Sequence, residues 1–169
     1  MQAFPQFKNQ RAGQILIESI VALSVLIMGL LGLISLLSQS LGLNRVIADN
    51  YTGTYLAAEG IEVVKNIVDQ NTLNGHAFDT GIASGDYAVD FTTNSLSDTN
   101  WNRPLKFDPN TNEYSYTGSK DSIFTRRVTV TLLGSPTAEI KVNSQVTWTT
   151  RGNGNFSINL EDHFMKWRP

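Results

Sequence analysis

The feature that most constrains this chain is a run of 26 residues, 19–44, without Asp, Glu, Lys or Arg. Its first part, residues 19–37, contains twelve Leu, Ile or Val residues. As a helix the run would be about 39 Å long. A bilayer needs about 20 apolar residues, whereas about 12 to 14 suffice for a helix buried in a soluble core. The run therefore favours a helix that spans a membrane.

The residues before this run are basic. Residues 1–17 contain Lys8 and Arg11 and no acidic residue. By the positive-inside rule, the N-terminus stays in the cytoplasm and the C-terminal part is exported. The sequence thus predicts a single-pass protein of the cytoplasmic (inner) membrane.

Two simpler interpretations compete with this one. An ordinary secretory signal has a basic start, an apolar stretch of about 7–15 residues and a small-residue cleavage site, and residues 38–40 (Ser-Gln-Ser) offer such a site. A plain membrane anchor is the other alternative. Neither explains Glu18, because a carboxylate at the mouth of a membrane helix is costly and marks a functional site. The alternative for Glu18 itself is a solvated carboxylate at the start of the helix, where it interacts favourably with the positive end of the helix dipole.

The residues around Glu18 form a short motif, Gly13-Gln14-Ile15-Leu16-Ile17-Glu18. This motif resembles the processing site of type IV prepilins and type II secretion pseudopilins. The resemblance implies that a prepilin peptidase cleaves between Gly13 and Gln14, that Gln14 becomes the N-methylated N-terminus, and that Glu18 is the fifth residue of the mature chain. Gln14 and Ile15 differ from the Phe and Thr usual in the family, and an N-terminal Gln can also cyclise.

The same resemblance implies a role for Glu18 in assembly. Its carboxylate would pair with a freed α-amine in the membrane, where opposite charges attract strongly and offset each other's desolvation. The implied partners are other pilin or pseudopilin subunits, the prepilin peptidase, the inner-membrane assembly platform and the lipid bilayer. The destination would be an extracellular or periplasmic filament.

A long helix is expected to continue past the membrane, since no proline lies between Pro5 and Pro104. We predict a helix from Ile15 to about Gln70, ending near Asn71 before the stop signal Asn74-Gly75. Small residues that allow close helix approach in membranes are Gly29, Gly32 and Gly42. One amphipathic face at spacings of three and four is predicted for the second half, formed by Ile47, Tyr51, Tyr55, Ala58, Ile61, Val64 and Val68.

The C-terminal part alternates between apolar and polar residues, as strands do. We predict strands at 87–92, 124–132, 140–149 and 156–160, with turns at 134–136 and 152–155 and a loop-rich segment at 71–122. Arg126 falls on the apolar face of its strand. The last three strands would form an antiparallel meander with one wet and one buried face. The tail 162–169 is expected to pack on the sheet.

The predicted fold class is therefore α+β, a pilin-like fold. Its parts would be a leader at 1–13, a membrane and assembly half of the helix at 14–44, an amphipathic half at 45–71, and a globular antiparallel β head at 72–169.

Sequence motifs for chemistry give little support to an enzyme. There are no cysteines, and we find no phosphate-binding loop, nucleophile elbow or metal-ligand spacing. We expect His76 and His163 to be surface residues, and the segment 108–119 to be a polar turn rather than a calcium loop. A net charge of -2 does not suggest nucleic-acid binding. No catalytic residue, cofactor or metal is predicted.

Two functions remain open from the sequence. The first is a minor pilin or pseudopilin, a structural subunit of a type IV pilus-like filament. The alternative is a membrane-anchored extracellular binding module, an adhesin or DNA-uptake receptor, that does not polymerise.

Overall fold

A computed structural model describes residues 10–150 and 154–166. The chain divides into two compact units, 1–45 and 46–169, and the helix α1 (Gln10–Leu73) contributes residues to both. Three segments lie outside the described part: residues 1–9 of the expected leader 1–13, residues 151–153 near the expected turn, and residues 167–169, which include Trp167.

The first unit consists, in its described part, of the helical residues 10–45. Helix α1 begins five residues before the predicted start at Ile15 and ends three residues after Gln70. Its end is closed by backbone hydrogen bonds from Asn74 N to the Gln70 carbonyl at 3.0 Å and from His76 N to the Asn71 carbonyl at 2.9 Å. Gly75 follows with a positive φ of 75°, which agrees with the stop signal in the sequence.

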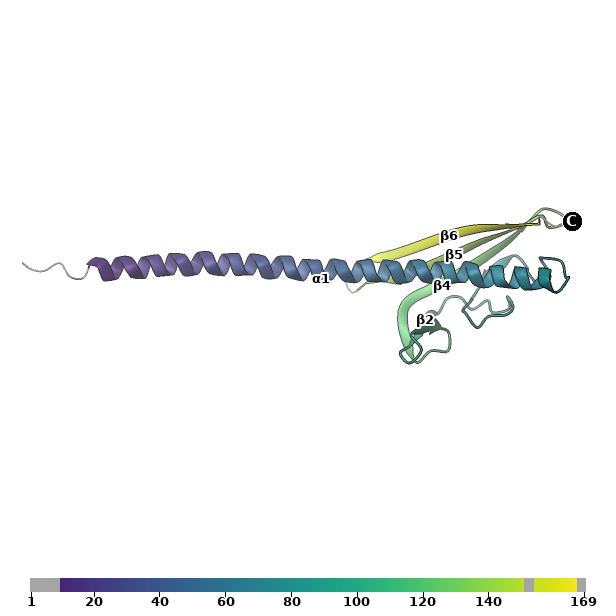
Figure 1. The fold of residues 1–169 in the computed structure, drawn as a ribbon, viewed down its shortest axis with the longest axis horizontal. Coiled ribbons are helices and arrows are strands. Elements are labelled where there is room, and N and C mark those ends of the chain that lie inside the picture. The colour runs from purple at the N-terminus through teal and green to yellow at the C-terminus, as the bar shows by residue number, and fades with distance from the viewer. Residues whose placement is uncertain (1–9, 151–153, 167–169) are drawn as a thin grey trace, which may run out of the picture. The chain divides into compact units, whose positions relative to one another are not determined.

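The second unit contains an antiparallel sheet of six strands among the described residues. The strands are β1 (Gly85–Tyr87), β2 (Pro104–Asp108), β3 (Glu113–Ser115), β4 (Lys120–Leu133), β5 (Glu139–Thr149) and β6 (Asn155–Met165). Their order is β3-β2-β4-β5-β6, and β1 also pairs with β4. Figure 1 shows that the long strands β4, β5 and β6 run along the C-terminal part of α1. The predicted α+β fold class is confirmed.

The meander β4–β5–β6 follows the alternation of its sequence. Phe124 lies opposite Trp148 in the β4–β5 pair, and Val146 lies opposite Ile158 in the β5–β6 pair. The predicted inward positions are buried or nearly so, and the threonines between them are more exposed. Strand β6 is longer than predicted and continues to Met165, so the tail up to that residue belongs to the sheet and Phe164 packs against the core.

Other predictions for this unit were wrong. The strand at 87–92 is only β1, Gly85–Tyr87, because the chain turns at Asp90 through its side-chain hydrogen bonds. Strands β2 and β3 were missed in the segment expected to be loops.

The buried face of α1 also differs from the predicted one. Ile47, Tyr51 and Tyr55 are 51%, 65% and 74% exposed. The helix is buried instead along a neighbouring stripe at spacings of three and four, formed by Gly53, Leu56, Ala57, Gly60, Val63, Val64, Ile67 and Val68. Only Val64 and Val68 of the predicted face are buried, and Ile61 is half-buried. The apolar face that the sequence seemed to offer to the sheet is therefore largely left in solvent.

The core forms two clusters between this stripe and the sheet. One contains Val64, Val89 and Val142, and the other contains Leu56, Leu105 and Trp148. A chain of aromatic contacts joins the second cluster, with ring centroids 5.1–5.9 Å apart, from Phe107 through Tyr114, Phe124 and Trp148 to Phe156.

Candidate functional sites: an uncovered apolar helix and a buried arginine

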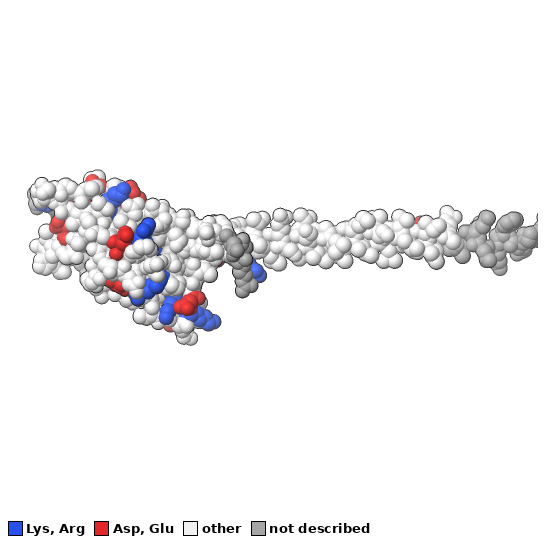
Figure 2. Space-filling view, turned by 180° about the vertical axis from the view of Figure 1, so that it is seen from behind, with Lys and Arg blue, Asp and Glu red and all other residues white. Residues whose placement is uncertain are grey.

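The apolar part of α1 is uncovered on every side. Large side chains from Ile15 (66% exposed) to Leu43 (61% exposed) are all solvent-accessible in this unit. Among the described residues, α1 is the helix long and apolar enough to cross a membrane, and its most apolar segment is not buried at all. In Figure 2 charged side chains gather over the sheet-bearing unit, whereas this part of the helix is almost free of them. A helix that is apolar all round and uncovered indicates membrane insertion or a signal sequence.

Two hydroxyl groups of this segment are satisfied by the helix itself. The Ser19 hydroxyl donates to the Leu16 carbonyl at 2.9 Å, and the Ser24 hydroxyl donates to the Ile20 carbonyl at 2.8 Å. Such internal bonds are required in lipid, where no water is available as a partner. The segment is thus compatible with a bilayer in its backbone and in these two hydroxyl groups.

The predicted processing residues lie together at the start of this helix. Gly13, Gln14 and Glu18 are all in α1 and all exposed. Gln14 and Glu18 are four residues apart and therefore lie on the same helical face, one turn from each other. The three glycines of the apolar segment, Gly29, Gly32 and Gly42, have no side chain or other non-local atom within 4 Å of an added Cβ.

Two other glycines, which the sequence analysis did not single out, set the distance between helix and sheet. A Cβ at Gly53 would lie 2.7 Å from Cζ3 of Trp148, and a Cβ at Gly60 would lie 2.4 Å from Oγ of Ser144. Gly53, Ala57 and Gly60 recur on the buried stripe, so small residues bring the α1 backbone close to β5. In the sequence, the spacing of these small residues was the pattern that could have indicated which face of the helix packs on the sheet.

Arg126 is the polar centre of the helix–sheet contact. Its side chain is fully buried, on the apolar face of β4 as the sequence indicated. Its guanidinium donates to the Leu56 carbonyl at 2.7 Å, to the Val89 carbonyl, and to Oε1 of Glu59 at 3.2 Å. The buried charge is thereby compensated by one carboxylate and two carbonyl dipoles. A single side chain ties α1, β4 and the segment after β1 together.

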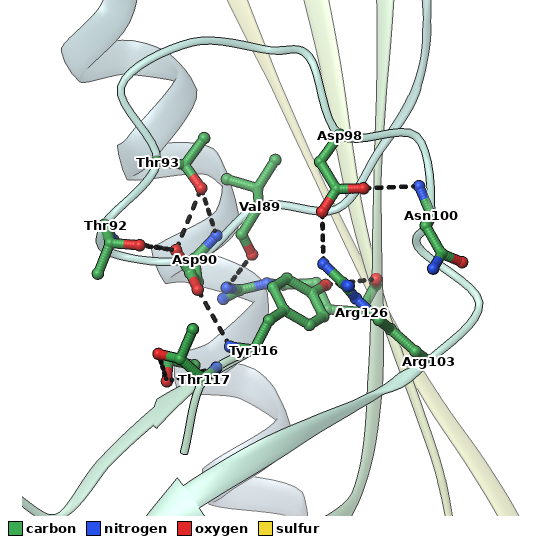
Figure 3. A network of polar contacts seen from close by, with 11 residues as sticks. Val89, Asp90, Thr92, Thr93, Asp98, Asn100, Arg103, Tyr116, Thr117 and Arg126 are labelled. Carbon is green, nitrogen blue, oxygen red and sulfur yellow. Dashed lines mark hydrogen bonds and ion pairs between the residues drawn. The ribbon is translucent and has the colours of Figure 1, made fainter.

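A second polar network lies next to Arg126 (Figure 3). Asp90 is buried, and its carboxylate accepts hydrogen bonds from Thr92 N at 3.0 Å, from the Thr92 and Thr93 hydroxyls, and from Tyr116 N at 3.1 Å. Burial raises the pKa of Asp90, but these hydrogen bonds together outweigh burial, and the net pKa lies below its usual value. Asp90 is therefore a charged anchor for the turn that begins at this residue.

Arg103 completes this network on its outer side. Its guanidinium pairs with Asp98 and stacks over the ring of Tyr116, 4.3 Å from the ring centroid. Burial raises the pKa of Tyr116, and the nearby charges of Arg126 and Arg103 oppose that effect. Trp101 similarly lies under Arg127, with 4.8 Å between guanidinium carbon and ring centroid. These aromatic and basic residues hold the loop against the sheet.

The two histidines have different surroundings. His76 is exposed, as predicted. His163 is also on the surface, but it lies between two carboxylates, with Nδ1 on Glu139 and Nε2 at 3.0 Å from Glu161. Hydrogen bonds with Glu139 first and Glu161 second raise the pKa of His163. Hydrogen bonds from Lys141, then Asn143 and His163, lower the pKa of Glu161 to about 2.

The segment 108–119 contains the last residue of β2, the turn at 109–112, all of β3 and the four residues after it. The Asp108 carboxylate accepts from the backbone N of Asn110 at 2.9 Å, and Asn112 closes the turn with a φ of 59°. Asp108 thus forms a local Asx turn, in agreement with the expected polar turn. Among the residues with described placement, no three His, Cys, Asp or Glu side chains form a group suited to a metal ion.

A comparison of the chain with models of protein families, with curated proteins and with solved structures found no match. What defines its class is the architecture. A long N-terminal apolar helix whose C-terminal part packs on an antiparallel sheet is a pilin-like architecture. This architecture fits a pilin-like protein with a membrane-inserted N-terminal helix.

Proposed function

We propose that this chain is a minor pilin or pseudopilin, a structural subunit of a type IV pilus-like filament, and not an enzyme. The observation that supports this proposal most is the position of the motif 13–18 in the first turns of α1, directly before the uncharged run 19–44. A spanning helix alone would also suit a simple anchor. The Gly13–Glu18 spacing at the start of such a helix favours an assembly subunit over an anchor.

Processing would create the assembly site. Cleavage by a prepilin peptidase between Gly13 and Gln14 frees an α-amine at Gln14, the candidate for N-methylation. Because Gln14 and Glu18 are one helical turn apart, this amine and the Glu18 carboxylate are within reach of each other on one chain. They can equally pair between neighbouring chains, which would draw a new subunit into register. The chemistry is a charge pairing in low dielectric, and no cofactor takes part.

The sheet-bearing unit would be displayed outside the cytoplasmic membrane, and then on the filament. Lys8 and Arg11 favour a cytoplasmic N-terminus. The proposed partners are the other filament subunits, the inner-membrane assembly platform and the surrounding lipid. Nothing in the charge of the chain calls for a nucleic acid.

The substitution Glu18→Val tests this function. We expect the variant to insert into the membrane normally, because the change removes a charge next to an apolar helix, but to be lost from purified filaments. Glu62→Gln, which changes an exposed carboxylate on the same helix outside the apolar segment, is the matched control. Normal incorporation of the Glu18→Val variant would contradict the proposal and favour a membrane-anchored binding module.

A further inference from the structure

An open groove of about 510 Å³ lies where α1, the loop after β1 and the β2–β3 hairpin meet. Its walls include three aromatic side chains, Tyr55, Phe91 and Tyr114, and two carboxylates, Glu59 and Glu113. We refer to it as the aromatic groove. All of its residues belong to the second unit, and it shares no residue with the apolar segment or the motif 13–18.

Two aromatic side chains of this groove, Phe91 and Tyr114, are held in place. Phe91 is 49% exposed, although it follows one of the most firmly anchored residues of the chain, Asp90. The hydrogen bonds of Asp90 with Thr92, Thr93 and Tyr116 fix the turn that presents Phe91 outward (Figure 3 shows the Asp90 contacts). On the hairpin side, the ring of Tyr114 rests edge-on against Phe124, with 5.9 Å between centroids. Aromatic rings that lie together at the surface and are rimmed by polar residues, as Tyr55, Phe91 and Tyr114 do here, are a feature of docking surfaces.

The charge of the groove is negative on its open side. Glu113 is exposed and, among the described residues, forms none of the ion pairs. Glu59 is 31% exposed and contacts Arg126, whose own side chain is completely buried. No Lys, Arg or His lines the groove. Burial raises the pKa of Tyr114, and the negative charge of Asp49 raises it further. A third carboxylate therefore acts on the same surface.

The groove continues into the exposed apolar stripe of α1. Ile47, Tyr51 and Tyr55 are spaced by four residues, so they share one helical face, and Tyr55 forms the end of this face inside the groove. The surface is therefore an apolar strip that leads to rings flanked by carboxylates.

We infer that the aromatic groove docks an arginine side chain of a partner protein chain, with apolar neighbours of that arginine lying on Ile47 and Tyr51. A guanidinium is the group that matches both features of the wall, since it stacks on aromatic faces and pairs with carboxylates through planar donors. Lysine satisfies the charge but stacks less well, because its ammonium is compact and strongly hydrated. The inference concerns the sheet-bearing unit and holds whether or not the chain polymerises.

A titration with blocked amino acids tests this inference. The full ¹⁵N-labelled chain in detergent micelles is titrated with N-acetyl-arginine amide, and in parallel with the neutral isostere N-acetyl-citrulline amide and with N-acetyl-lysine amide. We expect saturable shifts of the Phe91, Glu113 and Tyr114 amides with arginine. The citrulline derivative cannot form the ion pair or the cation–π contact, so we expect it to bind about tenfold more weakly than the arginine derivative.

Two variants separate the two parts of the recognition. Glu113→Gln removes the open carboxylate and Tyr55→Leu removes the most exposed ring, and each should weaken arginine binding several-fold while the amide spectrum stays dispersed. Glu62→Gln, elsewhere on the same helix, should change nothing. Equal shifts with citrulline, equal binding of lysine, or shifts spread over other carboxylates such as Glu161 would each overturn the inference, as would the absence of shifts at the groove.

Discussion

The guanidinium of Arg126 donates a 2.7 Å hydrogen bond to the backbone carbonyl of Leu56, which lies 70 residues earlier in the chain. This bond joins the middle of β4 to the part of α1 that packs on the sheet. The Arg126 side chain is completely buried, so its positive charge must be compensated inside the protein. The compensating groups are this carbonyl, the Val89 carbonyl and the Glu59 carboxylate. The contact between helix and sheet is thus polar at its centre and apolar around it.

Removing this arginine should strongly destabilise the second unit. We expect Arg126→Ala to cost about 3–5 kcal/mol, because it opens a cavity and leaves the Val89 carbonyl without its donor. Arg126→Lys should recover little, since one ammonium cannot replace the planar donors. Arg103→Ala, which breaks a partly exposed ion pair, is the control and should cost about 0–1 kcal/mol. Urea unfolding of the full chain in micelles measures these values, and equal costs for the two arginines would contradict this account.

The close approach of α1 to β5 predicts a sensitive glycine. In an open helix, Gly60→Ala would stabilise by about 1 kcal/mol through helix propensity. Here the added Cβ would lie 2.4 Å from Ser144 Oγ and 3.0 Å from Val128 Cγ2, so we expect a net loss of about 1–3 kcal/mol. The Ser144 hydroxyl has no hydrogen-bond partner among the described atoms, so adding Ser144→Ala should restore part of the loss. If Gly60→Ala alone stabilised the protein, the helix would have to lie further from the sheet than these distances imply.

Asp90 is expected to be required for the loop that presents Phe91. Asp90→Ala should cost about 1–3 kcal/mol, because the partly buried hydrogen bonds from Thr92, Thr93 and Tyr116 lose their acceptor. The pKa of Asp90 is lowered in the fold, so its stabilising effect is complete above its usual value of 3.8 and is lost as the pH falls through the lowered pKa. Acid unfolding of wild type and Asp90→Asn checks this, and identical curves would contradict it.

His163 should make the β5–β6 pair sensitive to pH. Its pKa is raised above 6.5 by Glu139 and Glu161, so its contribution is complete below pH 6.5 and is lost as the pH rises through the raised pKa. Glu161 acts in the opposite range, because its pKa of about 2 makes its contribution complete above pH 4.5 and lost towards pH 2.

A proton NMR titration of the His163 ring tests this directly. Glu139→Gln should bring the pKa of His163 back towards 6.5. The protection factors of the Val142 and Asp162 amides, which correct for the base catalysis of exchange itself, should fall at alkaline pH in wild type but not in His163→Gln. A His163 that titrates at or below 6.5 in wild type would be inconsistent with the two-carboxylate contact.

Much of this fold follows from local sequence patterns. The uncharged run 19–44 and the absence of proline predicted the helix to within a few residues at either end, and alternation predicted the central strands β4 and β5. Strands β2 and β3 were missed because Pro104, Pro109 and several asparagines give their short hairpin the composition of a loop.

The face of the helix could not be chosen from periodicity alone. Ile47, Tyr51 and Tyr55 have the same spacing as the truly buried stripe, so both faces satisfied the pattern. Small residues at 53, 57 and 60 decide between them, but only once the sheet is present for them to approach. The contacts of Arg126 with Leu56 and Val89 likewise could not be predicted from local sequence, because these residues lie far apart in the chain. The roles of Gly13, Gln14 and Glu18 remain predictions of the sequence motif.

The measurement that tests the central proposal most directly is the mass of the mature N-terminus. The full chain is co-expressed with a prepilin peptidase, purified from membranes and analysed by intact-mass and N-terminal peptide mass spectrometry. The account predicts a chain that begins at Gln14, and a Gly13→Asp variant that keeps residues 1–13. A wild-type chain that retains its first 13 residues, or one that begins at another residue such as Leu41, would contradict it.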